Sequence, residues 1–215
     1  MKARQPPPDA KRRRRRLTLL AGAAALGGAA LWWRKNPSAC PYSQRFWVQA
    51  PHPIITRERL REILEPQRGE RILEVGPGTG YYTLDVSSWI GIDGKLDIVD
   101  VQQQMLDHTV ARAAEIGISN ITPTRADATQ MPFEDAAFDA AFLVTVLGEI
   151  PDQDAAMREL ARVLKPGGRL VVGELLGDPH YVRLDPMRLR AAAAGLKFER
   201  RSGSGLGYFA RFAKP

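Results

Sequence analysis

Residues 56–215 alternate between short apolar runs and stretches in which apolar positions recur every three or four residues. Continuous apolar runs predict strands buried on both faces of a parallel sheet, and the longer period predicts helices that cover the sheet. Strands are predicted at 71–75, 95–99, 120–125, 138–144 and 169–173. Helices are predicted at 57–64, 81–89, 101–116, 152–164 and 185–194, with Thr56 as the N-cap of the first and Gly195 ending the last.

Two further segments, 196–201 and 207–212, are separated only by a short Gly/Ser turn. Because such a turn is too short for a parallel crossover, these segments are predicted to form an antiparallel hairpin. The chain is therefore expected to be an α/β protein with a Rossmann-like sheet and helices on both faces.

The first predicted strand ends in Glu74 and runs into a glycine-rich loop at 76–80, and the second ends in Asp100. A strand, a glycine turn, a helix and a second strand tipped by a carboxylate are typical of a nucleoside-binding half-fold. A dinucleotide fingerprint would need a third glycine at position 81, where this chain has Tyr81, and the loop has no Lys for a phosphate. The pattern therefore favours a ligand without phosphate over NAD or ATP.

The N-terminal segment differs in composition from the rest of the chain. Residues 1–35 hold ten Lys or Arg against one acidic residue, whereas residues 36–215 carry 21 basic and 23 acidic residues. A basic run at 12–16 precedes an uncharged, Ala/Gly-rich stretch at 17–33 that ends in two tryptophans. This pattern is typical of a short membrane helix with an interfacial anchor, and a cleaved secretion signal or an uninformative tail are the alternatives.

The expected organisation has four parts: a basic disordered tail at 1–16, a membrane-anchor or surface helix at 17–35, a linker and cap at 36–55, and the α/β domain at 56–215. The positive-inside rule would export that domain. We instead expect residues 11–35 to lie on a membrane surface, with the domain membrane-associated on the cytoplasmic side. A cytoplasmic protein is the alternative.

The composition of the body excludes several classes of site. Its near-neutral charge argues against nucleic acid as a partner. The single cysteine, Cys40, excludes an internal disulfide and a cysteine-based zinc cluster. No His or carboxylate pair has a metal-binding spacing, so no metal site is expected.

Five short motifs occur in order along the chain: Glu74-Val75-Gly76-Pro77-Gly78-Thr79-Gly80, Asp97-Ile98-Val99-Asp100, Arg125-Ala126-Asp127-Ala128, Phe138-Asp139 and Leu164-Lys165-Pro166-Gly167-Gly168. With these motifs, residues 56–215 resemble class I S-adenosylmethionine-dependent methyltransferases, in the branch typified by ubiquinone/menaquinone biosynthesis enzymes. The resemblance implies a seven-stranded sheet of order 3-2-1-4-5-7-6 with strand 7 antiparallel. It also implies that 56–215 is a methyltransferase domain.

The resemblance implies S-adenosyl-L-methionine as cofactor. Glu74 would face the cationic methionyl part, Asp100 the ribose hydroxyls, and Asp127 with the Ala128 N–H the adenine. Each carboxylate also has an alternative role that involves no ligand. Glu74 would be a capped strand end, Asp100 a helix N-cap and Asp127 an aspartate in a turn. The expected cofactor-binding residues are Glu74, Gly76, Pro77, Gly78, Gly80, Tyr81, Asp100, Val101, Asp127, Ala128 and Thr145.

The implied activity is methyl transfer by in-line displacement to a small-molecule or lipid-like acceptor. Tyr42, Phe46 and Trp47 are expected to form an apolar lid over that acceptor. A general base is needed only for a hydroxyl or unactivated amine, so the catalytic residue is left open. The candidates are Glu149 and His180. The alternatives are that Glu149 is a charge at a helix N-terminus and that His180 is a solvated loop histidine.

Two other functions stay open from the sequence. One is a catalytically silent membrane-associated protein that binds S-adenosylmethionine. The other is an NAD-dependent oxidoreductase, against which the missing third glycine counts.

Overall fold

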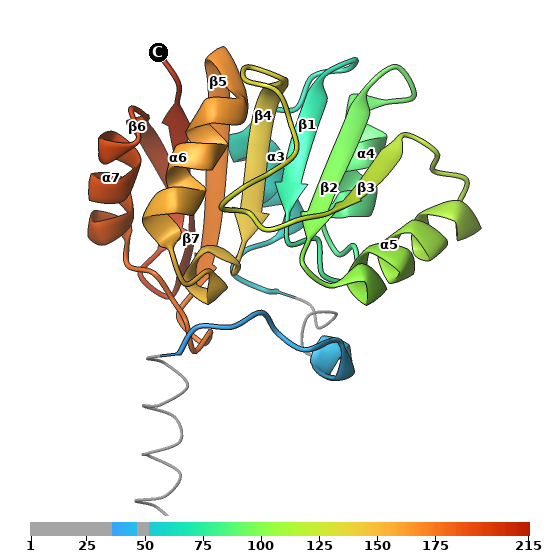
Figure 1. The fold of residues 1–215 in the computed structure, drawn as a ribbon, viewed down its shortest axis with the longest axis horizontal. Coiled ribbons are helices and arrows are strands. Elements are labelled where there is room, and N and C mark those ends of the chain that lie inside the picture. The colour runs from blue at the N-terminus through green and yellow to red at the C-terminus, as the bar shows by residue number, and fades with distance from the viewer. Residues whose placement is uncertain (1–35, 47–51) are drawn as a thin grey trace, which may run out of the picture. The chain divides into compact units, whose positions relative to one another are not determined.

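The computed structural model describes residues 36–46 and 52–215, and the chain divides into two compact units, Met1–Pro37 and Ser38–Pro215. The second unit is built on a seven-stranded sheet of order β3-β2-β1-β4-β5-β7-β6 (Figure 1). The strands are β1 Arg71–Val75, β2 Lys95–Asp100, β3 Ile121–Arg125, β4 Phe138–Val144, β5 Leu164–Leu175, β6 Lys197–Ser204 and β7 Gly207–Ala213. The helices are α3 Arg57–Leu64, α4 Thr83–Ile90, α5 Gln103–Glu115, α6 Gln153–Val163 and α7 Leu184–Ala193, with short 3₁₀ turns η1 Tyr42–Gln44 and η2 Leu147–Glu149.

The direction of the strands follows the expected pattern. Strands β1 to β5 pair in parallel, and β7 is antiparallel to both β5 and β6. The predicted α/β class, the strand order and the terminal hairpin are therefore confirmed. The carboxyl ends of the parallel strands lie at one edge of the sheet, the lower edge in Figure 1. The loops after β1, β2, β4 and β5 therefore lie at this edge.

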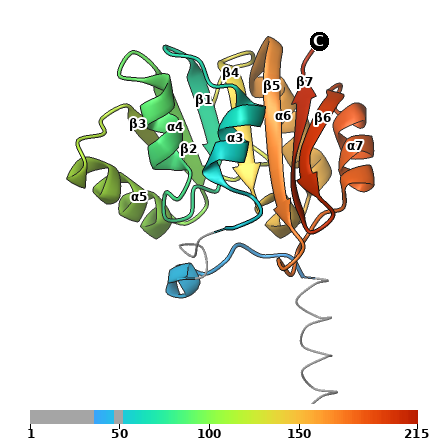
Figure 2. The same ribbon diagram turned by 180° about the vertical axis from the view of Figure 1, so that it is seen from behind.

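Two apolar layers enclose the sheet. Helices α3, α4 and α5 pack on one face through residues that include Leu60, Val86 and Leu106. Helices α6 and α7 pack on the other face through residues that include Leu160 and Met187. Figure 2 shows the first face from the front.

Several helix starts follow from local capping. The Thr56 hydroxyl accepts a hydrogen bond from the Arg59 amide at 3.3 Å, and α3 has the bounds that the sequence predicts. The Asp152 carboxylate caps α6 in the same way by accepting from the Ala155 amide. Each side chain satisfies an amide that the first helical turn leaves without a partner.

Strand β5 begins earlier than predicted. Leu164 already pairs with Phe138, and the register shifts before Ala140. Gly167 has φ +77° and donates its amide to the Lys214 carbonyl, while the Lys214 amide donates to the Gly168 carbonyl. Gly167 and Gly168 therefore form an irregularity within a long strand and not a separate turn, because their backbone groups remain hydrogen-bonded to Lys214.

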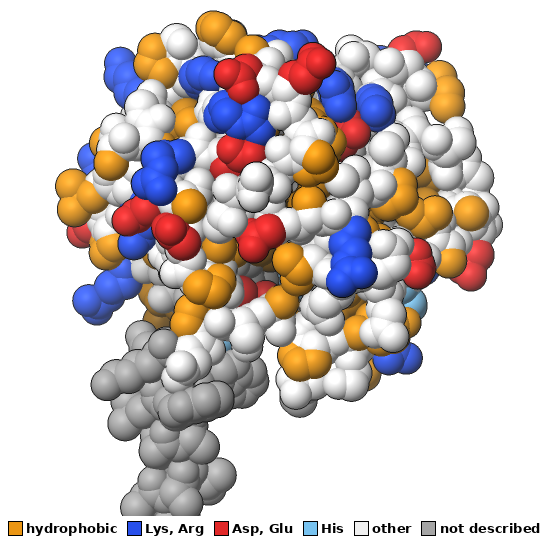
Figure 3. Space-filling view, viewed as in Figure 1, with side chains coloured by type: hydrophobic (Ala, Val, Ile, Leu, Met, Phe, Trp, Pro, Cys, Tyr) orange, Lys and Arg blue, Asp and Glu red, His pale blue; other side chains and the backbone are white. Residues whose placement is uncertain are grey.

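The two N-terminal segments predicted at 1–16 and 17–35 lie outside the described residues, as does Trp47. Within the described part of the chain, no helix is both long enough and apolar enough to cross a membrane. On the face shown in Figure 3, basic and acidic side chains are interspersed over the domain.

Candidate functional site

The glycine loop after β1 has the backbone conformation that glycine favours. Gly76, Gly78 and Gly80 have φ of +68°, +56° and +81°. The Gly76 amide donates to the Val99 carbonyl at 2.8 Å, which ties the loop to the end of β2. Because side-chain-bearing residues rarely adopt positive φ, the loop can keep this path only with glycine at these positions.

The glycines also leave room for neighbouring side chains. A Cβ on Gly76 would lie 2.4 Å from Val146 Cγ2, just beyond β4. A Cβ on Gly80 would lie 3.0 Å from Thr109 Cγ2 on α5, and the Thr109 hydroxyl donates to the Gly78 carbonyl at 3.0 Å. The loop is therefore held closely between α5 and the segment after β4.

Glu74 is a buried carboxyl group beside this loop. It is 3% exposed, and its Oε2 has no hydrogen-bond partner. Burial raises the pKa of Glu74 to about 8, and the nearby Thr83 hydroxyl opposes the shift only in part. An unpaired buried carboxyl oxygen is costly, so this position fits a ligand that brings its own ammonium or other cation.

Asp100 lies at the end of β2. Its Oδ1 accepts from the Gln102 amide at 2.8 Å, and burial raises its pKa while this bond and one from Val101 oppose the shift. Helix α5 starts only at Gln103, after Gln102 as N-cap. The alternative reading of Asp100 as the cap of a helix starting at 101 is therefore wrong, because the chain first turns at 101 and 102.

The third predicted contact region follows β3. Asp127 is exposed, and its Oδ1 accepts from both the amide and the hydroxyl of Thr129 at 2.8 and 2.7 Å. These two hydrogen bonds agree with the alternative interpretation, in which Asp127 is an aspartate that stabilises a turn. Ala128 and Met131 are buried, whereas Val101 is 43% exposed and could cover a ligand.

The remaining predicted cofactor residues have ordinary packing partners. The Arg57 guanidinium lies 4.2 Å from the centroid of the Tyr81 ring, and His52 makes an edge contact with that ring. Pro77 is buried in the loop. Thr145 has φ +55°, and its hydroxyl donates to the Val144 carbonyl.

The catalytic candidates lie at the carboxyl ends of β4 and β5. Glu149 Oε2 accepts from the Cys40 amide at 3.2 Å, and burial raises the pKa of Glu149 to about 8. The His180 amide donates to Asp178 Oδ1 at 2.7 Å. The two loops meet at Gly148, where a Cβ would lie 1.8 Å from the His180 carbonyl oxygen.

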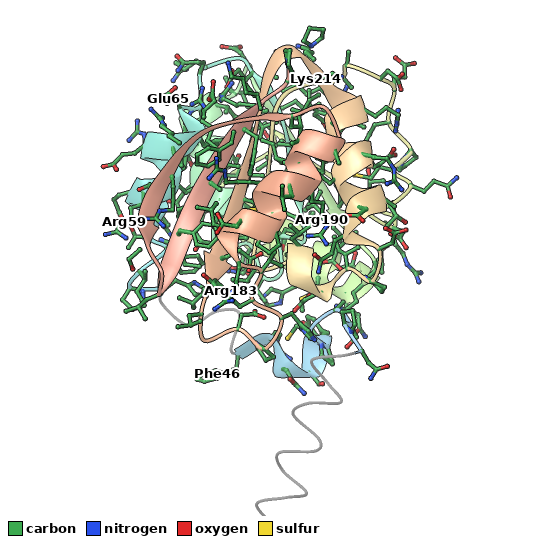
Figure 4. All side chains as sticks on the ribbon, turned by 90° about the vertical axis from the view of Figure 1, so that its left-hand side faces the viewer. Phe46, Arg59, Glu65, Arg183, Arg190 and Lys214 are labelled. Atoms are coloured by element: carbon green, nitrogen blue, oxygen red, sulfur yellow. The ribbon has the colours of Figure 1, made fainter. Side chains whose placement is uncertain are left out.

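The segment 38–46, here called the strap, crosses this edge of the sheet. The Gln102 side chain donates Nε2 to the Cys40 carbonyl at 2.9 Å and accepts the Tyr42 amide at 3.0 Å. The Tyr42 hydroxyl lies 3.3 Å from His108 Nδ1. Phe46, 71% exposed, lies at the same end of the domain as Arg183 and opposite Lys214 (Figure 4).

Sequence reasoning missed Gln102, Glu174 and Asp178. No periodicity marks Gln102, since its role depends on a segment 60 residues away. Glu174 carried a usable signal, because it is an acidic residue ending an apolar strand, as Glu74 is. Among the described residues, no group of three or more His, Cys, Asp or Glu could hold a metal ion.

The sheet order, the glycine loop and the carboxylates near the ends of β1 and β2 are those of the class I S-adenosylmethionine-dependent methyltransferase fold. More narrowly, residues 51–181 match the model of the ubiE/COQ5 methyltransferase family. This match covers more than half of the chain, and the chain belongs to that family.

Two curated relatives are both named ubiquinone/menaquinone biosynthesis C-methyltransferase UbiE. The protein of Idiomarina loihiensis is 35% identical and that of Escherichia coli K12 38% identical, each over 109 residues. These matches span 50% of this chain and 43% of each relative, which is less than half of their length.

Solved structures share the fold. A SAM-dependent methyltransferase from Aquifex aeolicus superposes with a TM-score of 0.76 at 20% identity, covering 82% of this chain and all of that one. The [4+2]-cyclase SpnF superposes with a TM-score of 0.66 at 23% identity, covering 74% of this chain and 79% of that one.

Proposed function

We propose that this protein transfers the methyl group of S-adenosyl-L-methionine to a small quinone-type ring. The observation that carries the proposal is Glu74, a carboxyl group buried beside the glycine loop with an unpaired Oε2. A cofactor with an ammonium group and a positive sulfur, and with no phosphate, suits this carboxyl group and this loop better than a dinucleotide does, because a nearby positive charge favours the ionised carboxylate.

The residues present can be assigned to the parts of this cofactor. Glu74 would pair with the ammonium group, and Asp100 would accept hydrogen bonds from the ribose. Ala128 and the exposed Val101 would border the adenine, with Asp127 turning from Thr129 to its amino group. When bound, the cofactor supplies a methyl carbon already attached to an excellent leaving group, so the protein mainly has to align the acceptor.

The quinone-type acceptor is proposed from family membership, because the matched relatives are named for ubiquinone and menaquinone biosynthesis. The strap agrees with an apolar acceptor, since Tyr42 is bound to Gln102 beside Asp100, and Phe46 is exposed at the same end of the domain as Arg183 (Figure 4). A lipid-like acceptor of another kind would meet the same surface.

We further propose that residues 11–35 hold the protein at the cytoplasmic face of a membrane, where a lipid-soluble acceptor would be concentrated. The support is the basic run followed by an uncharged segment. Fractionation of cells that express the full chain, with and without residues 1–35, tests this. Equal recovery of both forms in the soluble fraction would reject it.

Calorimetry and product analysis test the proposed function together. The purified chain should bind S-adenosylmethionine with micromolar affinity and should not bind NAD. With radiolabelled cofactor and a quinol lacking its ring methyl group, label should enter the organic extract. Absence of cofactor binding, or a preference for NAD, would reject the proposal.

A second function is a protein that binds the cofactor without transferring its methyl group. The observation in its favour is that SpnF, a cyclase by name, shares this fold. Tight cofactor binding with no label transferred to lipid, protein or small-molecule extracts would support it over methyl transfer.

A further inference from the structure

Four carboxyl groups gather at the edge of the sheet that carries the glycine loop. They are Asp100 at the end of β2, Glu149 after β4, Glu174 near the end of β5 and Asp178 in the loop after β5. The charges of Asp178 and Asp100 add to the rise in the pKa of Glu149 that burial causes. The charges of Asp178 and Glu149 likewise add to the rise in the pKa of Glu174. Glu174 is 1% exposed, and its Oε1 is buried without a hydrogen-bond partner.

Close backbone packing fixes this cluster. The absence of a side chain at Gly148 lets η2 lie directly against the His180 carbonyl, which brings the loop with Glu149 up to the loop with Asp178. On the other side, Val146 packs against Gly76. Glu149 is therefore held between the glycine loop and the turn after β5, where an acceptor would meet the cofactor.

We propose that Glu149 is the group that takes the proton released by a hydroxylated aromatic acceptor, and that Asp178 is a positioning residue acting through the charge of Glu149. This inference rests on the proposed methyl transfer. It adds to that function a base, a residue that controls the base, and an acceptor that must carry a ring hydroxyl.

The proposed step balances in atoms and charge. The Glu149 carboxylate removes the proton of a ring hydroxyl, and the neighbouring ring carbon of the phenolate forms a bond to the methyl carbon. The S–CH₃ bond breaks, and its electron pair remains on sulfur as a neutral thioether. The hydrogen on the methylated carbon then leaves as a proton, the oxygen is protonated again, and one proton per turnover is released.

The surroundings of Glu149 set its protonation. Burial is the main cause that raises its pKa to about 8, the Cys40 amide opposes the shift, and Asp178 and Asp100 add to it. A base with a pKa near the working pH is the most effective. The Cys40 bond uses Oε2, which leaves Oε1 for the acceptor proton.

Cys40, Glu174 and His180 are further titratable groups near Asp178 and Glu149, and burial, followed by the charges of Glu149 and Asp178, raises the pKa of the Cys40 thiol. Burial raises the pKa of Glu174 well above its usual range, and the nearby Asp178 and Glu149 add to the shift. The Glu174 Oε2 accepts from the Val182 amide at 3.0 Å and holds the loop after β5 in place. Burial raises the pKa of Asp178, and the His180 amide and ring oppose the shift.

Three carboxyl-to-amide variants of the full chain separate these roles. Glu149→Gln keeps an oxygen for the Cys40 amide and should lower kcat by about 10²-fold or more, with little change in cofactor affinity. Asp178→Asn keeps an oxygen for the His180 amide but loses the charge. Glu174→Gln is the matched control, because it changes a carboxyl group of the same cluster, whereas the charges that raise the pKa of Glu149 are those of Asp178 and Asp100.

The main readout does not require turnover. In the chain with ¹³C-labelled glutamate carboxyls, the Glu149 signal, assigned by its loss in Glu149→Gln, should titrate near pH 8. In Asp178→Asn the midpoint should move to lower pH, and in Glu174→Gln it should stay. The rising limb of the pH–kcat profile should follow the same midpoints.

Each outcome decides the matter. An unchanged Glu149 midpoint in Asp178→Asn, or full kcat in Glu149→Gln, would overturn the inference. An equal shift in Glu174→Gln would overturn the role given to Asp178. If no variant or parent methylates any hydroxylated ring, the proposed function fails, whereas the ¹³C titration still reports whether Asp178 controls Glu149.

Discussion

Gln102 binds the strap through the backbone of Cys40, with its side-chain Nε2 donating to the Cys40 carbonyl at 2.9 Å. The Oε1 of the same amide group accepts a hydrogen bond from the Tyr42 N–H. One side chain therefore donates to and accepts from the strap backbone, as the backbone of a paired strand would. Gln102 in turn donates its backbone amide to Asp100, the expected ribose ligand. The cover of the site and the proposed cofactor contact are therefore joined at one residue.

Gln102→Ala should release the strap. Two hydrogen bonds to backbone are lost, which costs about 1–3 kcal/mol of unfolding free energy. Hydrogen exchange at the Tyr42 amide should become much faster than in the parent. Gln103→Ala is the matched control, because Gln103 is exposed and bonds only to Asp107 on its own helix. Unchanged exchange at Tyr42 would show that Gln102 does not hold the strap.

Gly76→Ala should be more damaging than the same change at another left-handed glycine. Gly69 has φ +83° and open space where a Cβ would lie, so Gly69→Ala should cost only about 1–2 kcal/mol of backbone strain. Gly76→Ala adds the overlap with Val146, which costs about 1–3 kcal/mol more.

Urea denaturation of the glycine variants measures this difference. Val146→Ala in the Gly76→Ala background should recover part of the loss, since it removes the overlapping methyl groups and leaves the backbone strain. Equal losses for Gly69→Ala and Gly76→Ala would contradict the role of Val146.

Glu74 should make the unliganded protein less stable as the pH rises. Its folded pKa, about 8, is above the usual value of 4.5. The unfolded chain therefore gives up this proton first, and stability falls through the window between 4.5 and 8 by about 1.4 kcal/mol per pH unit at most.

Glu74→Gln should remove this dependence. The variant should equal or slightly trail the parent at pH 4.5 and should be the more stable form at pH 8.5, while losing cofactor affinity. Urea midpoints at the two pH values check the first part and calorimetry the second. A stability difference that does not change with pH would show that Glu74 is ionised in the folded protein.

Asp100→Asn should weaken cofactor binding more than Asp127→Asn does. Asp100 is partly buried at the end of β2, whereas Asp127 is exposed and already accepts two hydrogen bonds from Thr129. We expect a loss of about tenfold or more at 100, corresponding to about 1.4 kcal/mol, and a smaller loss at 127. Calorimetry with S-adenosylmethionine measures both. The reverse order would place the ribose elsewhere.

The strands and helices were predictable where local chemistry decides them. The bounds of α3, β1 and β4 agree with the sequence, because Thr56 caps the helix and apolar runs can be buried only inside the sheet. Helix α4 starts two residues later than expected, since 81 and 82 still belong to the turn of the glycine loop. The roles of Glu74, Asp100 and Asp127 in binding stay predictions.

The sequence by itself determined the α/β class, the glycine loop and the carboxylates at the ends of the first two strands. These features are written in neighbouring residues, since hydrophobic period and glycine spacing act within one element. Only the tertiary structure decided that Gln102 holds Cys40, that Val146 fills the space beside Gly76, and that Glu149, Glu174 and Asp178 share one site. Such contacts join segments far apart in the chain, and their energies depend on burial and distance, which no local pattern encodes.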